Sequence, residues 1–236
     1  FNEDQYADPF FGKLPEYLKE QLPEAQLITV AIGFKDRVQC YNKMKELNNS
    51  LVHPLEIYLT YWEVLKCSLK WFWKINFDPF QIKGKLYCLG HEITPFFDEF
   101  INFGGFRISI FQALHFDIAK RLGEMYKIKA CLMTYEGRPW ERFFMAGLRK
   151  ANMNTIIVGY QHTVIPLSAT DMFLHTKELG LIPIPDKIVT TGIITKKILE
   201  QFGSFPKEKI VTGCALRFES LQNLSLLKRR KDSKQK

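Results

Sequence analysis

The sequence predicts an α/β protein whose Rossmann-like, mostly parallel sheet is flanked by helices. From residue 128 onward, short apolar runs alternate with amphipathic stretches of helical length. Two of the apolar runs end in polar turns, one holding Glu136 and Arg138, the other Gln161 and His162. Strand–helix–strand units make neighbouring strands parallel. Both turns are therefore expected at one edge of a sheet, where open α/β sheets bind ligands.

The first half of the chain mixes helical and strand patterns. An aromatic face predicts a helix around residues 10–18, and a continuous apolar run predicts a buried strand at 26–34. A polar stretch follows, with a possible helix at 35–47, and a proline ends a short strand at 50–54. Periodic apolar residues predict the elements that come next: a helix at 55–75, a short strand at 86–89, and helices at 92–103 and 108–126.

The second half is more regular. Alternating patterns predict strands at 128–133, 155–159, 187–191 and 209–212, with helices at 139–151 and 193–202. Pro139 suits the first turn of its helix, because a proline there gives up no hydrogen bond that the helix needs. A Lys- and Arg-rich segment, residues 218–236, predicts a solvated basic tail.

The helix predicted at 55–75 allows two readings. One side carries an apolar stripe made of Trp62, Leu65, Leu69, Phe72 and Trp73. Charged residues interrupt the helix, so it cannot span a bilayer: Glu63, Lys66, Lys70 and Lys74. The helix either packs into a globular core or lies on a membrane surface.

Composition narrows the class of protein. With 236 residues and 46% hydrophobic residues, the chain can bury a sizeable core. Its formal charge of +8 suits an anionic ligand or a membrane surface, and no nucleic-acid partner is expected. The cysteines lack metal-ligand spacing and are expected to be reduced thiols, with no metal bound: Cys40, Cys67, Cys88, Cys131 and Cys214. The acidic N-terminus predicts no signal peptide, and the absence of an initial Met suggests a piece of a longer protein.

The two polar turns supply the candidate site residues. Glu136 is a candidate general acid or base, or a ligand for sugar hydroxyls; alternatively, it caps the next helix or pairs with Arg138 or Arg142. His162 is a candidate acid, base or phosphate donor. Arg138 is expected to bind a phosphate or carboxylate, and Gln161 to position the ligand. A loop containing Ser168, Thr170 and Asp171 could close over this site.

Trp140 also has two readings. Its indole could stack on a sugar, or it could anchor the core. No phosphate loop, nucleophile elbow or zinc-binding pattern accompanies these residues in the sequence.

Several motifs together resemble the bacterial surface-carbohydrate glycosyltransferases of the GT-B type. The motifs are Y-E-G-R-P-W-E-R, then T-I-I-V-G-Y-Q-H, then P-D-K-I-V-T-T-G, then P-K-E-K-I-V-T-G-C-A-L-R-F. The resemblance covers most of residues 6–218 and is strongest from about residue 130. It departs at Thr163, where the family usually has glycine, the residue that allows the closest backbone approach to a ligand. Thr163 nevertheless joins the candidate residues for acceptor or phosphate binding.

The resemblance implies that residues 1–217 form the acceptor-side domain, one half of a GT-B architecture. Residues 218–236 would be a basic tail or the start of the interdomain connection. The implied reaction transfers sugar from a nucleotide donor to a glycan or lipid-linked glycan acceptor. It needs no cofactor and is expected in the cytoplasm, with peripheral contact at the inner membrane face. A missing C-terminal domain would bind the nucleotide, so this chain alone is expected to be inactive.

Two other functions remain open at this point. One is an enzyme resembling the sugar-nucleotide 2-epimerases, which share the layout of strands and turns. The other is a non-catalytic module that binds a glycan or a membrane.

Overall fold

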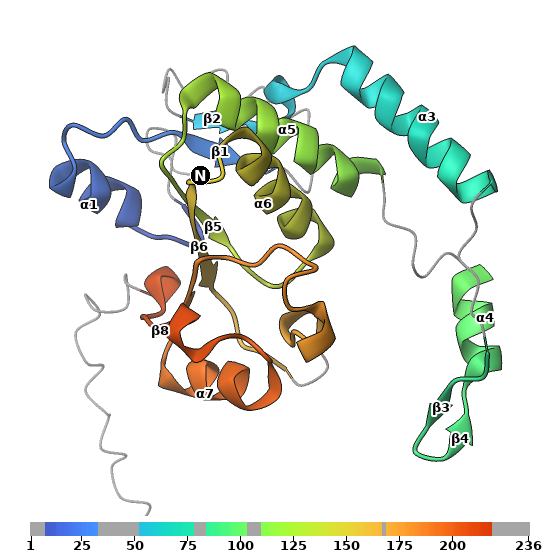
Figure 1. Ribbon diagram of the computed structural model, residues 1–236. Helices are drawn as coiled ribbons and strands as arrows, with labels where there is room; N and C mark the ends of the chain where they lie inside the picture. Colours follow the sequence, from blue (N-terminus) through green and yellow to red (C-terminus); the bar gives the residue numbers. More distant parts are fainter. Residues whose placement is uncertain (1–7, 33–51, 78–83, 103–109, 167–168, 219–236) are drawn as a thin grey trace, which may run out of the picture.

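A four-stranded parallel sheet forms the centre of the computed structural model, which describes residues 8–32, 52–77, 84–102, 110–166 and 169–218. Its strands lie in the order β5 (Ala130–Thr134), β6 (Ile156–Gln161), β7 (Lys187–Thr190) and β8 (Ile210–Thr212). All three pairings are parallel. Helices flank this sheet (Figure 1), which confirms the predicted α/β, Rossmann-like fold.

Helices α6 (Pro139–Ala151) and α7 (Ile193–Phe202) connect consecutive strands of the sheet and have the predicted bounds. Helix α5 (Ile110–Tyr126) packs against α6. Gly147 allows the two helices to approach closely, because a Cβ there would lie 2.2 Å from the Phe116 carbonyl oxygen. Several apolar side chains of these helices and the sheet are fully buried in the core: Ile118, Ala119, Met145, Leu148, Ile157 and Ile188.

The N-terminal part holds helix α1 (Leu14–Gln21) and a parallel pair of strands, β1 (Thr29–Ala31) and β2 (Val52–Pro54). Both strands fall within the predicted segments. The helix predicted around residues 10–18 begins and ends later than expected. The helix predicted at 35–47 lies outside the described residues.

The prediction of one helix at 55–75 is wrong, because this segment forms two separate elements. A short 3₁₀ helix, η1 (Leu55–Tyr58), precedes α3 (Tyr61–Phe77). The new start has a physical cause in the pair Thr60 and Glu63. The Glu63 carboxylate accepts a hydrogen bond from the Thr60 N–H at 2.7 Å, and the Thr60 hydroxyl accepts one from the Glu63 N–H at 3.3 Å. This reciprocal capping box begins a helix at the residue after Thr60.

A hairpin and a helix follow, at the lower right of Figure 1, away from the central sheet. Strands β3 (Tyr87–Cys88) and β4 (His91–Glu92) pair in antiparallel fashion, and α4 spans Thr94–Asn102. Leu89 and Gly90 both have positive φ, 49° and 83°, as a two-residue hairpin turn requires. The helix predicted to begin at residue 92 therefore begins two residues later.

Short 3₁₀ helices complete the second half: η2 (Thr170–Met172), η3 (Thr176–Glu178) and η4 (Lys207–Lys209). None of the helices in the described ranges is long and apolar enough to cross a membrane.

Candidate functional site

The two polar turns meet at the carboxyl edge of the sheet, as the sequence predicts. Strands β5 and β6 are parallel, with Thr134 opposite Tyr160. The His162 Nε2 atom lies 3.6 Å from Glu136 Oε1. The Thr163 hydroxyl donates a hydrogen bond to the same carboxylate oxygen at 3.4 Å. Side chains that follow two different strands thus surround one carboxylate.

Glu141 fixes the turn that presents Glu136. Arg138 is the N-cap of α6 and Glu141 is its third helical residue. The Glu141 carboxylate accepts hydrogen bonds from the backbone N–H groups of Glu136, at 3.0 Å, and Arg138, at 2.8 Å. This is the carboxylate half of a capping box. Glu141 therefore takes the capping role that one reading gave to Glu136, and the Glu136 side chain stays partly exposed at 31%.

The buried Glu141 carboxyl makes stability depend on pH. Burial raises its pKa from 4.5 to about 8, although the backbone N–H donors act in the opposite direction. Between these values the unfolded chain releases a proton that the folded protein keeps. The contribution of Glu141 to stability is therefore complete below its unfolded pKa and is lost as pH rises through its folded pKa.

We expect the contribution of Glu141 to the free energy of unfolding to fall between pH 4.5 and about 8, its unfolded and folded pKa values. The slope due to this one group is at most about 1.4 kcal/mol per pH unit. Glu141→Gln should remove that component, as measured by urea unfolding across the pH range. An unchanged slope in the variant would contradict the role of Glu141.

Arg138 joins the turn to a later loop. The guanidinium Nε of Arg138 lies 3.5 Å from the Glu136 carboxylate, and its Nη1 lies 3.2 Å from the Asp171 carboxylate. The Arg138 side chain is 54% exposed, so a ligand could still reach it. Arg142 donates a hydrogen bond to the Asp171 carbonyl oxygen at 3.5 Å. Asp171 thus contacts the turn after β5, whereas closure of this loop over a ligand stays a prediction; Ser168 lies outside the described residues.

His162 is enclosed more than its position in a turn suggests. Its side chain is 8% exposed, and the ring of Phe10 meets it edge-on with centroids 4.4 Å apart. No hydrogen-bond partner for Nδ1 is found among the described residues, although the Tyr160 backbone is close enough to raise the pKa. Burial lowers the pKa of His162 below 6.5, and this outweighs the opposing effect of Glu136. The imidazole is therefore neutral at pH 7.

We expect His162 to titrate below pH 6.5 when its ring carbon–proton resonances are followed by NMR. The Glu136 carboxylate favours the protonated imidazole, so Glu136→Gln should lower the midpoint further. Glu124→Gln removes an exposed carboxylate elsewhere and should leave the midpoint unchanged. A midpoint above 6.5, or one that rises in Glu136→Gln, would contradict this account of the site.

Gln161 is buried and ties two turns together. It is 1% exposed, and its amide nitrogen donates a hydrogen bond to the Thr163 carbonyl oxygen. Its amide oxygen accepts one from the Thr191 hydroxyl at 3.3 Å. The amide therefore holds the turn after β6 against the turn after β7. Gln161 would therefore position a ligand indirectly, by holding Thr163 in place.

Thr163 needs no glycine-like backbone. Among the described non-glycine residues, Leu89 and Lys127 are the ones with positive φ. Threonine is thus compatible with the turn, and its hydroxyl contacts the Glu136 carboxylate.

Trp140 lies away from these side chains. It packs against the buried core, and its ring lies 5.4 Å from that of His115. This placement favours the reading of Trp140 as a core anchor.

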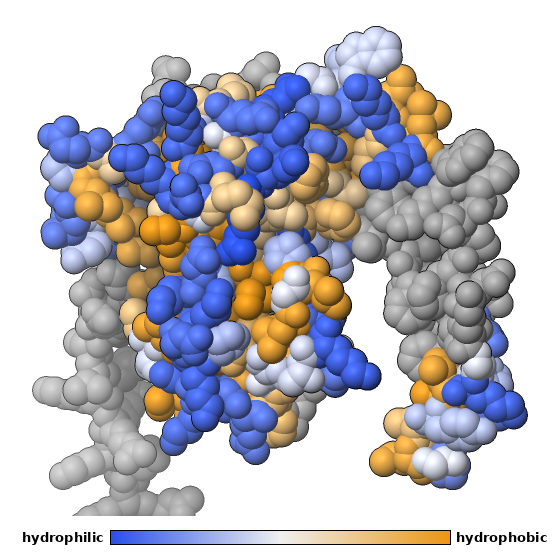
Figure 2. Space-filling view, viewed as in Figure 1, coloured by the Kyte–Doolittle hydropathy of each residue, from blue (hydrophilic) through white to orange (hydrophobic). Residues whose placement is uncertain are grey.

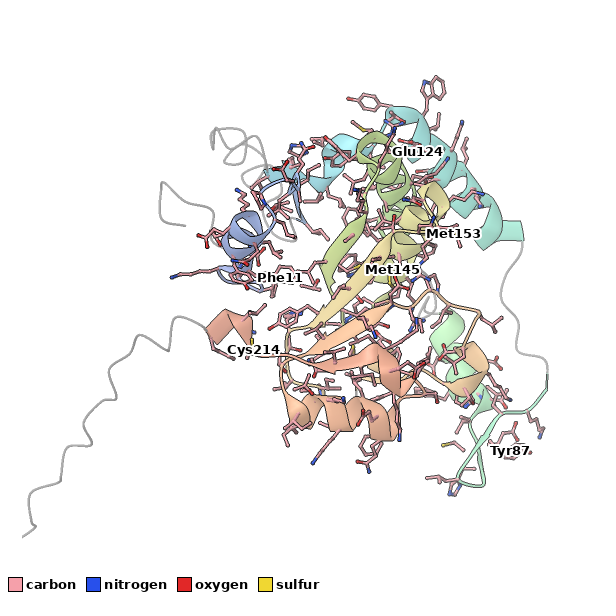
Figure 3. All side chains as sticks on the ribbon, turned by 60° about the vertical axis from the view of Figure 1, so that its left-hand side comes forward. Phe11, Tyr87, Glu124, Met145, Met153 and Cys214 are labelled. Atoms are coloured by element: carbon pink, nitrogen blue, oxygen red, sulfur yellow. The ribbon has the colours of Figure 1, made fainter. Side chains whose placement is uncertain are left out.

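The ends of the described chain also reach this edge. The Tyr160 hydroxyl donates a hydrogen bond to the Cys214 carbonyl oxygen and accepts one from the Leu216 N–H, both at 2.9 Å. The Phe11 ring lies 5.5 Å from that of Tyr160, and Figure 3 shows Phe11 and Cys214 on the same side of the sheet. Phe10 thus covers His162 in the turn after β6, and Phe11 and residues 214–216 contact Tyr160 near the end of that strand.

Within the described ranges, no cluster of three or more His, Cys, Asp or Glu side chains has an arrangement that could hold a metal ion. Comparisons with protein-family models, curated proteins and solved structures give no match to this chain.

Proposed function

We propose that this chain is the acceptor-side domain of a GT-B-type glycosyltransferase that assembles a surface polysaccharide. The observation that carries the proposal is the meeting of Glu136, Arg138 and His162 at the carboxyl edge of the parallel sheet. Ligands of open α/β sheets bind at this edge. The motifs that resemble the glycosyltransferases contain these same residues.

Glu136 is the proposed general base. Its carboxylate is partly exposed, whereas the His162 ring is almost enclosed. In the proposed step, Glu136 takes the proton of an acceptor hydroxyl while that oxygen bonds to the anomeric carbon of the donor sugar. The bond from this carbon to the diphosphate breaks, and the nucleoside diphosphate leaves with the electron pair. The Thr163 hydroxyl holds the Glu136 carboxylate in position through its hydrogen bond, and the neutral His162 ring lies beside it.

Arg138 is the proposed anion-binding residue. Its guanidinium is exposed enough to pair with a phosphate, either on a lipid-linked acceptor or on the donor. Before a phosphate binds, Asp171 holds the Arg138 guanidinium next to Glu136. On this proposal, a separate domain outside residues 1–236 binds the nucleotide and supplies most contacts to the donor.

The reaction class is tested with the protein encoded by the complete reading frame. A panel of nucleotide sugars is incubated with and without surface-glycan acceptors, and the products are followed by phosphorus and proton NMR. The proposal predicts that nucleoside diphosphate is released together with a glycosylated acceptor.

Other outcomes would contradict the proposal. Conversion of the nucleotide sugar into its epimer without any acceptor would identify an epimerase. Glycan binding without turnover of any donor would identify a non-catalytic module. Transfer by residues 1–236 alone would contradict the need for a second domain.

A further inference from the structure

Helix α3 presents an apolar face to solvent. Four of its side chains are exposed by 95%, 70%, 47% and 61%: Tyr61, Trp62, Leu65 and Leu69. At 3.6 residues per turn they fall within an arc of about 100°. The core-packing reading of this helix is therefore wrong for these residues. Apolar groups gathered on one exposed face indicate a site of interaction.

The charges on α3 are distributed unevenly around this face. Lys66 and Lys70 are exposed and lie along one border of it. Glu63 is the single acidic residue in the helix sequence. It turns toward α5, where its carboxylate accepts a hydrogen bond from Arg121 at 2.9 Å. The exposed face is consequently apolar with a basic border.

The helix is also placed where a flat surface could reach it. Figure 1 shows α3 at the upper right of the molecule, next to α5 and away from β5 and β6. In Figure 2, orange and blue residues adjoin at the upper right, where Figure 1 places the first turns of α3. The face is thus separate from the carboxyl-edge site.

We propose that this face of α3 lies on the surface of an anionic lipid bilayer. Leucines enter the boundary of the acyl chains, tyrosine and tryptophan prefer the headgroup level, and lysines pair with anionic headgroups. A second copy of the chain is a poorer occupant. Two such faces would bring four lysines together in a protein whose formal charge is already +8. The proposal does not depend on glycosyl transfer.

The test is co-sedimentation of the full chain with vesicles. One set contains phosphatidylglycerol and phosphatidylcholine, and the other contains phosphatidylcholine alone. We expect partitioning to be at least about tenfold stronger into the anionic vesicles at low salt, because each of the two lysines near such a surface contributes roughly fivefold. High salt should weaken the binding, since it screens the lysines.

Two double variants locate the surface. Lys66→Glu with Lys70→Glu should lower partitioning at least about tenfold, and Leu65→Gln with Leu69→Gln should lower it by a similar factor. The matched control, Lys197→Glu with Lys207→Glu, makes the same charge change at exposed lysines elsewhere and should bind more strongly than the α3 charge variant. Brominated acyl chains should quench tryptophan fluorescence, and less so in Trp62→Phe.

Three results would overturn the proposal. The first is equal vesicle binding by the wild-type protein and both α3 variants. The second is equal loss of binding in the control variant, which would indicate a general charge effect. The third is a dimer in solution that the leucine variants dissociate without changing vesicle binding; that result would assign the face to a second copy. Transfer to a lipid-free acceptor should be unchanged in every α3 variant, so this test and the glycosyltransferase test can fail separately.

Discussion

Glu136→Gln is expected to reduce sugar transfer by about 10² to 10⁴-fold, the usual contribution of a positioned acid or base. Glutamine has nearly the same shape and can still accept hydrogen bonds from Thr163, but it cannot take a proton. The backbone of the turn should not change, because the hydrogen bonds to the Glu141 side-chain oxygens come from the Glu136 backbone N–H, which the substitution keeps. The loss should therefore appear in the rate of the chemical step, measured in single-turnover experiments with the protein from the complete reading frame.

Glu124→Gln is the matched control. The Glu124 side chain is 55% exposed on α5 and pairs with Lys120 one helical turn away at 3.7 Å. This variant should transfer sugar at the wild-type rate. If Glu136→Gln also kept the wild-type rate while remaining folded, Glu136 would not be the general base.

Gly137→Ala is expected to destabilise the protein by about 3 to 5 kcal/mol, because two costs combine. Gly137 has φ of 74°, which side-chain-bearing residues rarely adopt, and a Cβ there would lie 1.9 Å from the Asp171 carbonyl oxygen. That atom belongs to the backbone, so relief requires the segment around Asp171 to move. The salt bridge between Asp171 and Arg138 should be lost with it. Urea unfolding measures the total cost.

Gly180→Ala separates the two costs. Gly180 has a similar φ of 78°, but a Cβ there would meet no atom within 4 Å. This variant should cost only about 1 to 2 kcal/mol, the strain of the left-handed backbone alone. Equal losses of stability in the two variants would show that the steric clash between a Cβ at position 137 and the Asp171 carbonyl oxygen adds nothing to the cost.

The elements around the site could be predicted because local signals agree there. The bounds of α6 follow from Pro139 at its start and from the apolar period along it, and β6 is a continuous apolar run. The start of α3 was mispredicted although the signal was present. Thr60 and Glu63 have the spacing of a capping box, but the apolar stripe on both sides of Thr60 concealed it. The exposure of the stripe depends on where α5 lies, which no local pattern specifies.

The site was predictable to the extent that topology determines it. Parallel pairing of β5 and β6 is sufficient to bring Glu136 and His162 to one edge. The enclosure of His162 depends on Phe10, which is distant in sequence, so no spacing rule indicates it. Glu141 could have been recognised, because a glutamate at the third position of a helix commonly accepts hydrogen bonds from the N-cap backbone.

Titration of residues 1–236 alone with an acceptor glycan shows whether the carboxyl edge of the sheet binds the acceptor. The chain is labelled with ¹⁵N and titrated with the acceptor glycan that supports transfer by the complete protein. We expect the largest amide shift changes at the carboxyl edge, at Glu136, Arg138, His162 and Thr163. Lys129 and Met153, at the opposite ends of the strands, should be unaffected. Shift changes confined to that opposite edge, or none at saturating glycan, would contradict acceptor binding at the carboxyl edge.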